Sequence, residues 1–119
     1  MPPPFKRAER VADLLHRELS RLLLREIKDP RLREVTITTV RVSADLRHAW
    51  IAFTGGTPER AADQLRGLRS AAGFLRGQLG RALHLRYAPE LSFEVDESVE
   101  RTLTVMRLLR EVRTEPDED

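Results

Sequence analysis

The sequence contains no cysteine, which excludes a disulfide framework and thiolate-ligated zinc. Aromatic residues make up only 5% of the 119 residues, so the core must consist mainly of Leu, Val and Ile. No apolar run approaches the length of a membrane span, and the N-terminal "MPPPFKRAER" lacks the apolar segment of a signal peptide. These absences predict a soluble cytoplasmic protein that has no membrane partner.

Lysine is also scarce, because Lys6 and Lys28 are the only lysines among 21 basic residues. The formal net charge is only +2, but four acidic residues lie in the C-terminal "TEPDED", so the rest of the chain is more basic than the total suggests. Arginine binds phosphate with a bidentate fork and stacks on bases. The composition therefore suits an RNA-binding protein, and it suits a merely soluble surface equally well.

No arrangement of residues typical of an enzyme occurs. The histidines, His16, His48 and His84, lie on different predicted elements without metal-ligand spacing. The string "GGTP" lacks the Gly-Lys-Ser/Thr ending of a P-loop, and no serine lies in a nucleophile elbow. We therefore expect no catalytic residue, metal, cofactor or small-molecule substrate.

The first half of the chain predicts a helix and a β-hairpin. Leucine and valine recur at steps of three and four over residues 5–28, and "KDPR" ends this helix because the residue before a proline avoids helical geometry. The β-branched "REVTITTVRVS" predicts a strand whose alternation slips at Thr38 and Thr39, as in a β-bulge. The turn "ADLR" and a second strand, "RHAWIAFT", complete an antiparallel hairpin.

The second half predicts a helix from Pro58, with Thr57 as N-cap, then a strand and a last helix. The strand is "LRYAPELSFEV", and Asp96 or Ser98 caps the last helix, on which Val99, Leu103, Met106 and Leu109 are in line. The order α-β-β-α-(kink)-α-β-α indicates one α+β domain over residues 5–113, a three-stranded sheet with helices packed on one face. Residues 1–4 and the acidic tail 114–119 are expected to be disordered.

Two glycine-containing strings compete for the kink. Leu75, Leu79 and Leu83 are spaced by four, so the G-x-x-G string 77–80 is predicted to be helical. We place the kink at Ala71-Ala72-Gly73, where small residues and a glycine permit a bend. The alternative is an unbroken helix that tolerates its glycine.

Three segments resemble the ribosome-binding factor A family: "RAERVADLLHRELSRLLLREIKDPRL", "VTITTVRVSADLRHAWIAF" and "LRSAAGFLRGQLGRALHLRYAPELSFEVDESVE". The resemblance implies a type-II KH-like domain in which an interhelical Ala-x-Gly replaces the G-x-x-G loop of other KH domains. It implies that the protein binds the free or immature 30S ribosomal subunit and its 16S rRNA, and assists late maturation and rRNA processing, with a link to cold adaptation. We expect a monomer that acts by conformational selection. The rival hypothesis is a protein-interaction module that uses the sheet or the acidic tail.

The predicted RNA-binding residues form two sets. The bend and the arginines around it form the first: Ser70, Ala71, Ala72 and Gly73 for close approach, with Arg66, Arg69 and Arg76 on phosphates. The second, weaker set is Lys6, Arg7, Arg10, Arg41 and Arg47. The alternative for any one arginine is a solvated surface with weak ion pairs. Among the aromatic residues, Phe74 and Tyr87 are expected in the core, and Trp50 is expected to be covered rather than to form a stacking platform.

Overall fold

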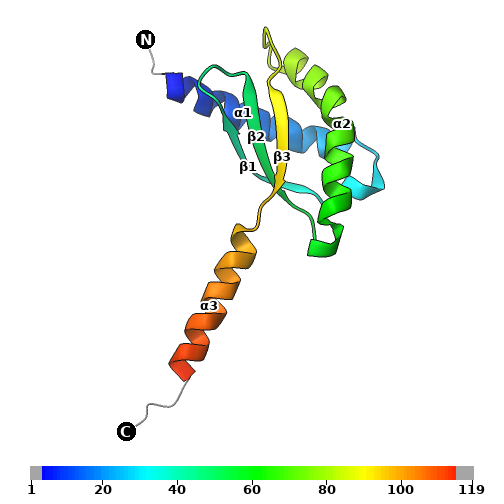
Figure 1. The fold of residues 1–119 in the computed structure, drawn as a ribbon. Coiled ribbons are helices and arrows are strands. Elements are labelled where there is room, and N and C mark those ends of the chain that lie inside the picture. The colour runs from blue at the N-terminus through cyan, green and yellow to red at the C-terminus, as the bar shows by residue number, and fades with distance from the viewer. Residues whose placement is uncertain (1–3, 115–119) are drawn as a thin grey trace.

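The computed structural model describes residues 4–114, with the side chains of residues 6–98 and 101–112 (Figure 1). Its helices and strands are α1 (Pro4–Arg25), β1 (Thr36–Val42), β2 (His48–Thr54), α2 (Ala61–Ala82), β3 (Glu90–Val95) and α3 (Ser98–Thr114). Two 3-10 turns, Pro30–Leu32 and Pro58–Arg60, precede β1 and α2. This order confirms the predicted α+β class. Residues 1–3 and 115–119, on which most of both predicted tails fall, lie outside the described residues.

The sheet has the order β1-β2-β3, with β1 antiparallel and β3 parallel to the central strand β2. The register between β1 and β2 shifts between Ile37 and Thr39, which confirms the predicted bulge. The third strand is shorter than predicted, because pairing with β2 begins only at Glu90. Tyr87 therefore precedes the strand and does not share its core face.

Helices α1 and α2 cover one face of the sheet and leave the other open, while α3 projects from the body (Figure 1). Most of the large side chains that are fully buried come from three elements: Leu15, Leu19 and Leu22 of α1, Ile51 and Phe53 of β2, and Leu68, Leu75 and Leu79 of α2. Pro89, directly before β3, is also fully buried. Nε2 of His16 lies 3.0 Å from the carbonyl oxygen of Ile37 and ties α1 to β1. The described layers are thus one sheet and two packed helices.

Helix α2 runs without interruption through the predicted kink, and its axis bends between its two ends (Figure 1). The two helices expected on either side of Gly73 are therefore one element. Gly73 does not adopt a positive φ, and the spacing of Leu68, Leu75 and Leu79 keeps one helical face on the core throughout. The string 77–80 is helical, as predicted.

The predicted burial of the three aromatic side chains is wrong. Phe74 is 46% exposed, Tyr87 is 67% exposed, and Trp50, on the open face of the sheet, is 38% exposed. Alternation along β2 correctly placed Trp50 on the face opposite to Ile51 and Phe53, but no described helix covers that face.

Candidate nucleic-acid interface

Five residues of the first predicted set lie along one exposed side of α2. At about 100° per residue, their positions fall within an arc of roughly 120°. We call them the α2 strip: Arg66, Arg69, Ser70, Gly73 and Arg76. All five are exposed, so the helix presents three guanidinium groups and one glycine on the same side.

Ala71 and Ala72 do not belong to this strip. Both are partly buried and pack against the hydrophobic core, on the side of the helix that carries Leu68 and Leu75. Of the four residues predicted for close approach, only Ser70 and Gly73 are exposed. The alanines instead bring α2 close to the core.

Gly73 leaves its backbone accessible, because a Cβ atom built at this position meets no heavy atom within 4 Å. Gly67 differs, since a Cβ atom there would lie 2.9 Å from Cδ2 of the buried Leu32. Gly67 is thus required by packing, whereas packing within the described residues does not require Gly73. The local sequence around Gly67 does not indicate this requirement, because its partner Leu32 is 35 positions away along the chain.

The three arginines of the α2 strip differ in the hydrogen bonds and ion pairs that their guanidinium groups form within the protein. Arg66 forms an ion pair with Asp63 one turn earlier. Arg76 donates hydrogen bonds to the carbonyl oxygens of Pro89 (3.0 Å, from Nε) and Ala88 (3.2 Å, from Nη2). Arg69 has no hydrogen bond or ion pair within the part of the chain that the structure describes. Arg69 is therefore the most available phosphate ligand of the three.

The second predicted set lies on other elements. Lys6, Arg7 and Arg10 are exposed on the first turns of α1, and Arg47 is exposed at the hairpin turn. Arg41 lies on β1, where its guanidinium carbon is 5.7 Å from the centroid of the Trp50 ring. The structure therefore does not gather all twelve predicted residues into one site.

One arginine of the α1 surface is engaged by a carboxylate. Nη2 of Arg21 lies 2.5 Å from Oε1 of Glu18, and this hydrogen bond lowers the pKa of Glu18. Arg21, which is not among the predicted RNA-binding residues, is thus a surface arginine in a weak ion pair. Arg7, Arg10 and Arg17 carry no such contact within the described residues.

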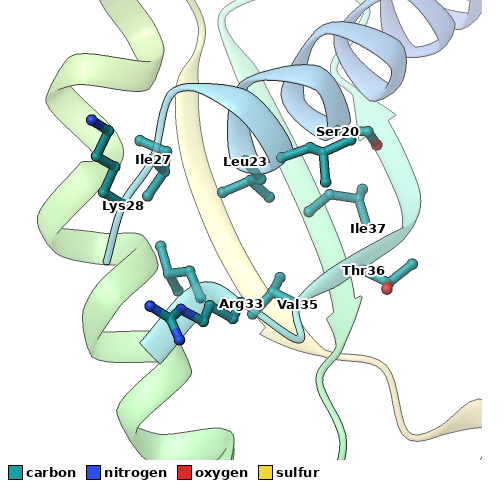
Figure 2. Close-up of a pocket in the computed structure, with 10 residues that line it drawn as sticks. Ser20, Leu23, Ile27, Lys28, Arg33, Val35, Thr36 and Ile37 are labelled. Carbon is teal, nitrogen blue, oxygen red and sulfur yellow. The ribbon is translucent and has the colours of Figure 1, made fainter. Parts of the chain in front are cut away.

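A pocket of about 620 Å³ lies between the end of α1, the turn Pro30–Leu32 and the start of β1. Figure 2 shows apolar side chains that include Leu23, Ile27 and Ile37 gathered in it, with Lys28 and Arg33 on one side. No carboxylate and none of the predicted RNA-binding residues lines it. The sequence predicts only the end of a helix at "KDPR" and gives no local signal of this pocket.

The described residues contain no group of three or more His, Cys, Asp or Glu side chains that could hold a metal ion. Across the described ranges, every helix is too short or too polar to span a membrane.

Residues 7–109 match the family model described as ribosome-binding factor A. The chain belongs to the ribosome-binding factor A family. It is 49% identical over 111 residues to ribosome-binding factor A of Syntrophobacter fumaroxidans, an alignment that covers 91% of this chain and 95% of the relative. It is 45% identical over 112 residues to ribosome-binding factor A of Geobacter metallireducens, an alignment that covers 93% of this chain and 95% of the relative.

Solved structures of the family share the KH-like fold. The crystal structure of ribosome-binding factor A from Thermus thermophilus superposes with a TM-score of 0.66 at 27% identity, over 74% of this chain and 94% of that chain. A homology model of the Thermus thermophilus protein, fitted into a cryo-EM map of its complex with the 30S subunit, gives a TM-score of 0.54 at 31% identity. That alignment covers 71% of this chain and 93% of the other.

Proposed function

We propose that this protein binds the small ribosomal subunit, and that the α2 strip contacts phosphates of the 16S rRNA. The observation that carries the proposal is the coincidence, on one exposed side of α2, of three arginines with the open backbone at Gly73. Arginine forks bind phosphate oxygens, and a glycine lets a sugar-phosphate chain approach the helix closely. The family and the complex of its Thermus thermophilus member with the 30S subunit support the choice of partner.

The proposed role is non-catalytic assistance to late maturation and rRNA processing. A folded domain that binds the immature arrangement of the RNA more tightly than the mature one shifts the population toward the immature form. Completion of assembly then lowers the affinity and releases the protein. This mechanism needs a rigid binding surface and no reacting group.

The direct experiment measures binding of the protein to isolated small subunits after charge reversal on the α2 strip. Arg66→Glu combined with Arg69→Glu should weaken binding at least about tenfold, because two phosphate contacts become repulsive. Arg76 is left intact, since its hydrogen bonds to Ala88 and Pro89 also hold the segment before β3.

The matched control is Arg33→Glu combined with Arg107→Glu, two exposed arginines that are not part of the α2 strip and that give the same change in net charge. This control should bind nearly as tightly as the unmodified protein. Equal weakening in the two double variants would show that only overall charge matters and would contradict the proposed surface.

A protein-interaction function has one observation in its favour. Helix α3 projects from the body and exposes six large apolar side chains, which are Leu103, Val105, Met106, Leu108, Leu109 and Val112. A complex made through such a surface would resist salt, whereas a complex made through phosphates weakens as salt rises. Binding to small subunits that is insensitive to salt would favour this second candidate.

A further inference from the structure

The open face of the sheet carries an exposed indole flanked by two nitrogen-containing side chains. Trp50 lies on the central strand β2 and is 38% exposed. On β1, the guanidinium carbon of Arg41 lies 5.7 Å from the Trp50 ring centroid. His48 lies two residues before Trp50 on β2. The centroids of the two rings are 4.5 Å apart, and the angle between the ring planes is 41°.

Strand pairing holds this group in place. Arg41 is opposite Trp50 in the β1–β2 register, and Ser92 is opposite Trp50 in the β2–β3 register. Nε2 of His48 lies 2.8 Å from Oγ of Ser92, and Nδ1 of His48 lies 3.9 Å from Oε2 of Glu90. The three paired strands thus hold the indole in place. The side chains beside it are held by the same strand pairing and by the contacts of His48.

We propose that Trp50 is a stacking platform for a base of single-stranded RNA, a second contact on the side of the sheet opposite to α1 and α2. The choice of RNA as partner rests on the proposed function. Single-strand binding proteins stack bases on exposed aromatic rings, and arginine supports this stacking. Arg41 lies on β1, the side of Trp50 on which a phosphate would be attracted.

The acidic residues of this face limit how the strand can lie. Glu90 and Glu94 are two positions before and after Ser92 on β3, and they repel phosphate. Their carboxylates accept hydrogen bonds from exocyclic amino groups of bases. The base edge therefore points toward β3 and the phosphates toward β1. Because the acids offset the arginines, this contact depends on stacking more than on charge.

The composition of the face favours RNA over a protein partner. Of the strand residues on it, only Trp50 and Ala52 are apolar. The others are polar or charged, namely Thr36, Thr39, Arg41, His48, Thr54, Glu90, Ser92 and Glu94. The buried centre of a protein interface is depleted of charge and mostly apolar, whereas base stacking needs one exposed ring and a cation.

The experiment uses the full chain and the fluorescence of Trp50, which is its only tryptophan. The protein is titrated with an oligoadenylate of about eight nucleotides, a length within the range of known single-strand sites. A titration with inorganic polyphosphate of equal charge separates stacking from phosphate binding. We expect saturable quenching by the oligoadenylate and none by polyphosphate. Equal quenching by both probes would overturn the proposal.

Variants test the same contact through the anisotropy of a labelled oligoadenylate. Trp50→Leu should bind about 5- to 150-fold more weakly, the loss expected for one stacked base, and Trp50→Phe should recover part of that loss. Arg41→Gln should also bind more weakly, whereas the charge-matched control Arg33→Gln should not. Thermal melting of Trp50→Leu checks that the fold persists. Unchanged affinity in a folded Trp50→Leu variant would refute the platform.

Binding to small subunits separates this inference from the proposed function. If the unmodified protein and Trp50→Leu bind subunits equally and the oligoadenylate does not quench, the platform fails and the proposed function stands. If the oligoadenylate quenches but subunits are not bound, the platform stands and the proposed function fails. If Trp50→Leu weakens subunit binding without any quenching by RNA, the face contacts a protein and the inference is wrong.

Discussion

The hydroxyl of Thr38 donates a hydrogen bond to Oδ2 of Asp96 at 2.6 Å and so joins the bulge of β1 to the start of α3. Oδ1 of the same carboxylate accepts the backbone N–H of Ser98 at 2.8 Å. The backbone N–H of Asp96 donates to the carbonyl oxygen of Phe53 at 2.7 Å. Asp96 therefore connects β1, β2 and α3, and the extra residue of the bulge supplies one of these links.

These contacts make part of the stability depend on pH. Hydrogen bonds from Ser98 and Thr38 lower the pKa of Asp96 from 3.8 to about 2. A carboxyl group whose pKa is lower in the folded state stabilises that state above its unfolded pKa and loses the effect as the pH falls. We expect thermal melts to show that Asp96→Asn lowers Tm at pH 7, and that the difference from the unmodified protein shrinks between about pH 4 and pH 2.

The control for this prediction is Asp45→Asn, which removes a carboxylate of the hairpin turn instead of the junction with α3. Asp45 also has a lowered pKa, caused first by the hydroxyl of Ser43. Only Asp96→Asn should alter the amide-exchange protection of the first turn of α3. Identical protection in the two variants would contradict the role given to Asp96.

Two glycines of α2 should respond oppositely to alanine. Both substitutions gain about 1 kcal/mol of helix propensity. Gly73→Ala places its methyl group in open space, whereas Gly67→Ala pushes against Leu32, and such overpacking costs about 1–3 kcal/mol. Chemical denaturation should therefore find Gly67→Ala less stable than Gly73→Ala by about 1–3 kcal/mol. Equal stability of the two variants would show that the contact of Gly67 with Leu32 is unimportant.

Sequence periodicity predicted the elements well, because each depends on local spacing. The long first helix follows from apolar residues at steps of three and four, and the hairpin with its bulge at Thr38 follows from the alternation of apolar residues. Periodicity assigned Trp50 to a face but could not tell whether another element covers that face. Covering is a tertiary property, and the structure leaves the face open.

The candidate site was predictable only in part, for a similar reason. Helical spacing alone places Arg66, Arg69 and Arg76 on one side of α2. It does not show that Arg76 is bound to the carbonyl groups before β3, since that partner lies 12 to 13 residues away. Residue size predicts a kink at Gly73, but the leucine spacing on the core side keeps the helix continuous.

A buried amide links α2 to the loop after β2. Gln64 is 3% exposed, and its Nε2 donates a hydrogen bond to the carbonyl oxygen of Gly55. Gln64→Leu leaves that carbonyl without its partner, which costs about 1–3 kcal/mol in the free energy of unfolding. Gln78→Leu, on the partly exposed side of the same helix, should cost much less. Comparable losses in denaturant titrations of the two variants would argue against this link.

The proposed close approach of RNA at Gly73 has a matched comparison within α2. A methyl group at Gly80 would face the side chain of Ala88 at 3.6 Å, so the backbone there is already covered. Gly73→Ala should stabilise the fold yet weaken binding to small subunits several-fold, whereas Gly80→Ala should leave binding unchanged. Binding assays and melts on the same samples separate the two effects. Undiminished binding by Gly73→Ala would mean that RNA does not approach this backbone.

If arginines of the α2 strip bind RNA phosphates, the affinity for small subunits must fall as salt rises, and the number of phosphate contacts sets how steeply it falls. The affinity for isolated small subunits is measured across a range of salt concentrations for the unmodified protein and for Arg69→Gln. Each phosphate contact contributes about −0.7 to −0.9 to the slope of log affinity against log salt. Phosphate binding by the α2 strip predicts a steep negative slope that becomes shallower by about 0.7–0.9 in Arg69→Gln. An affinity independent of salt, or the same slope in both proteins, would contradict it.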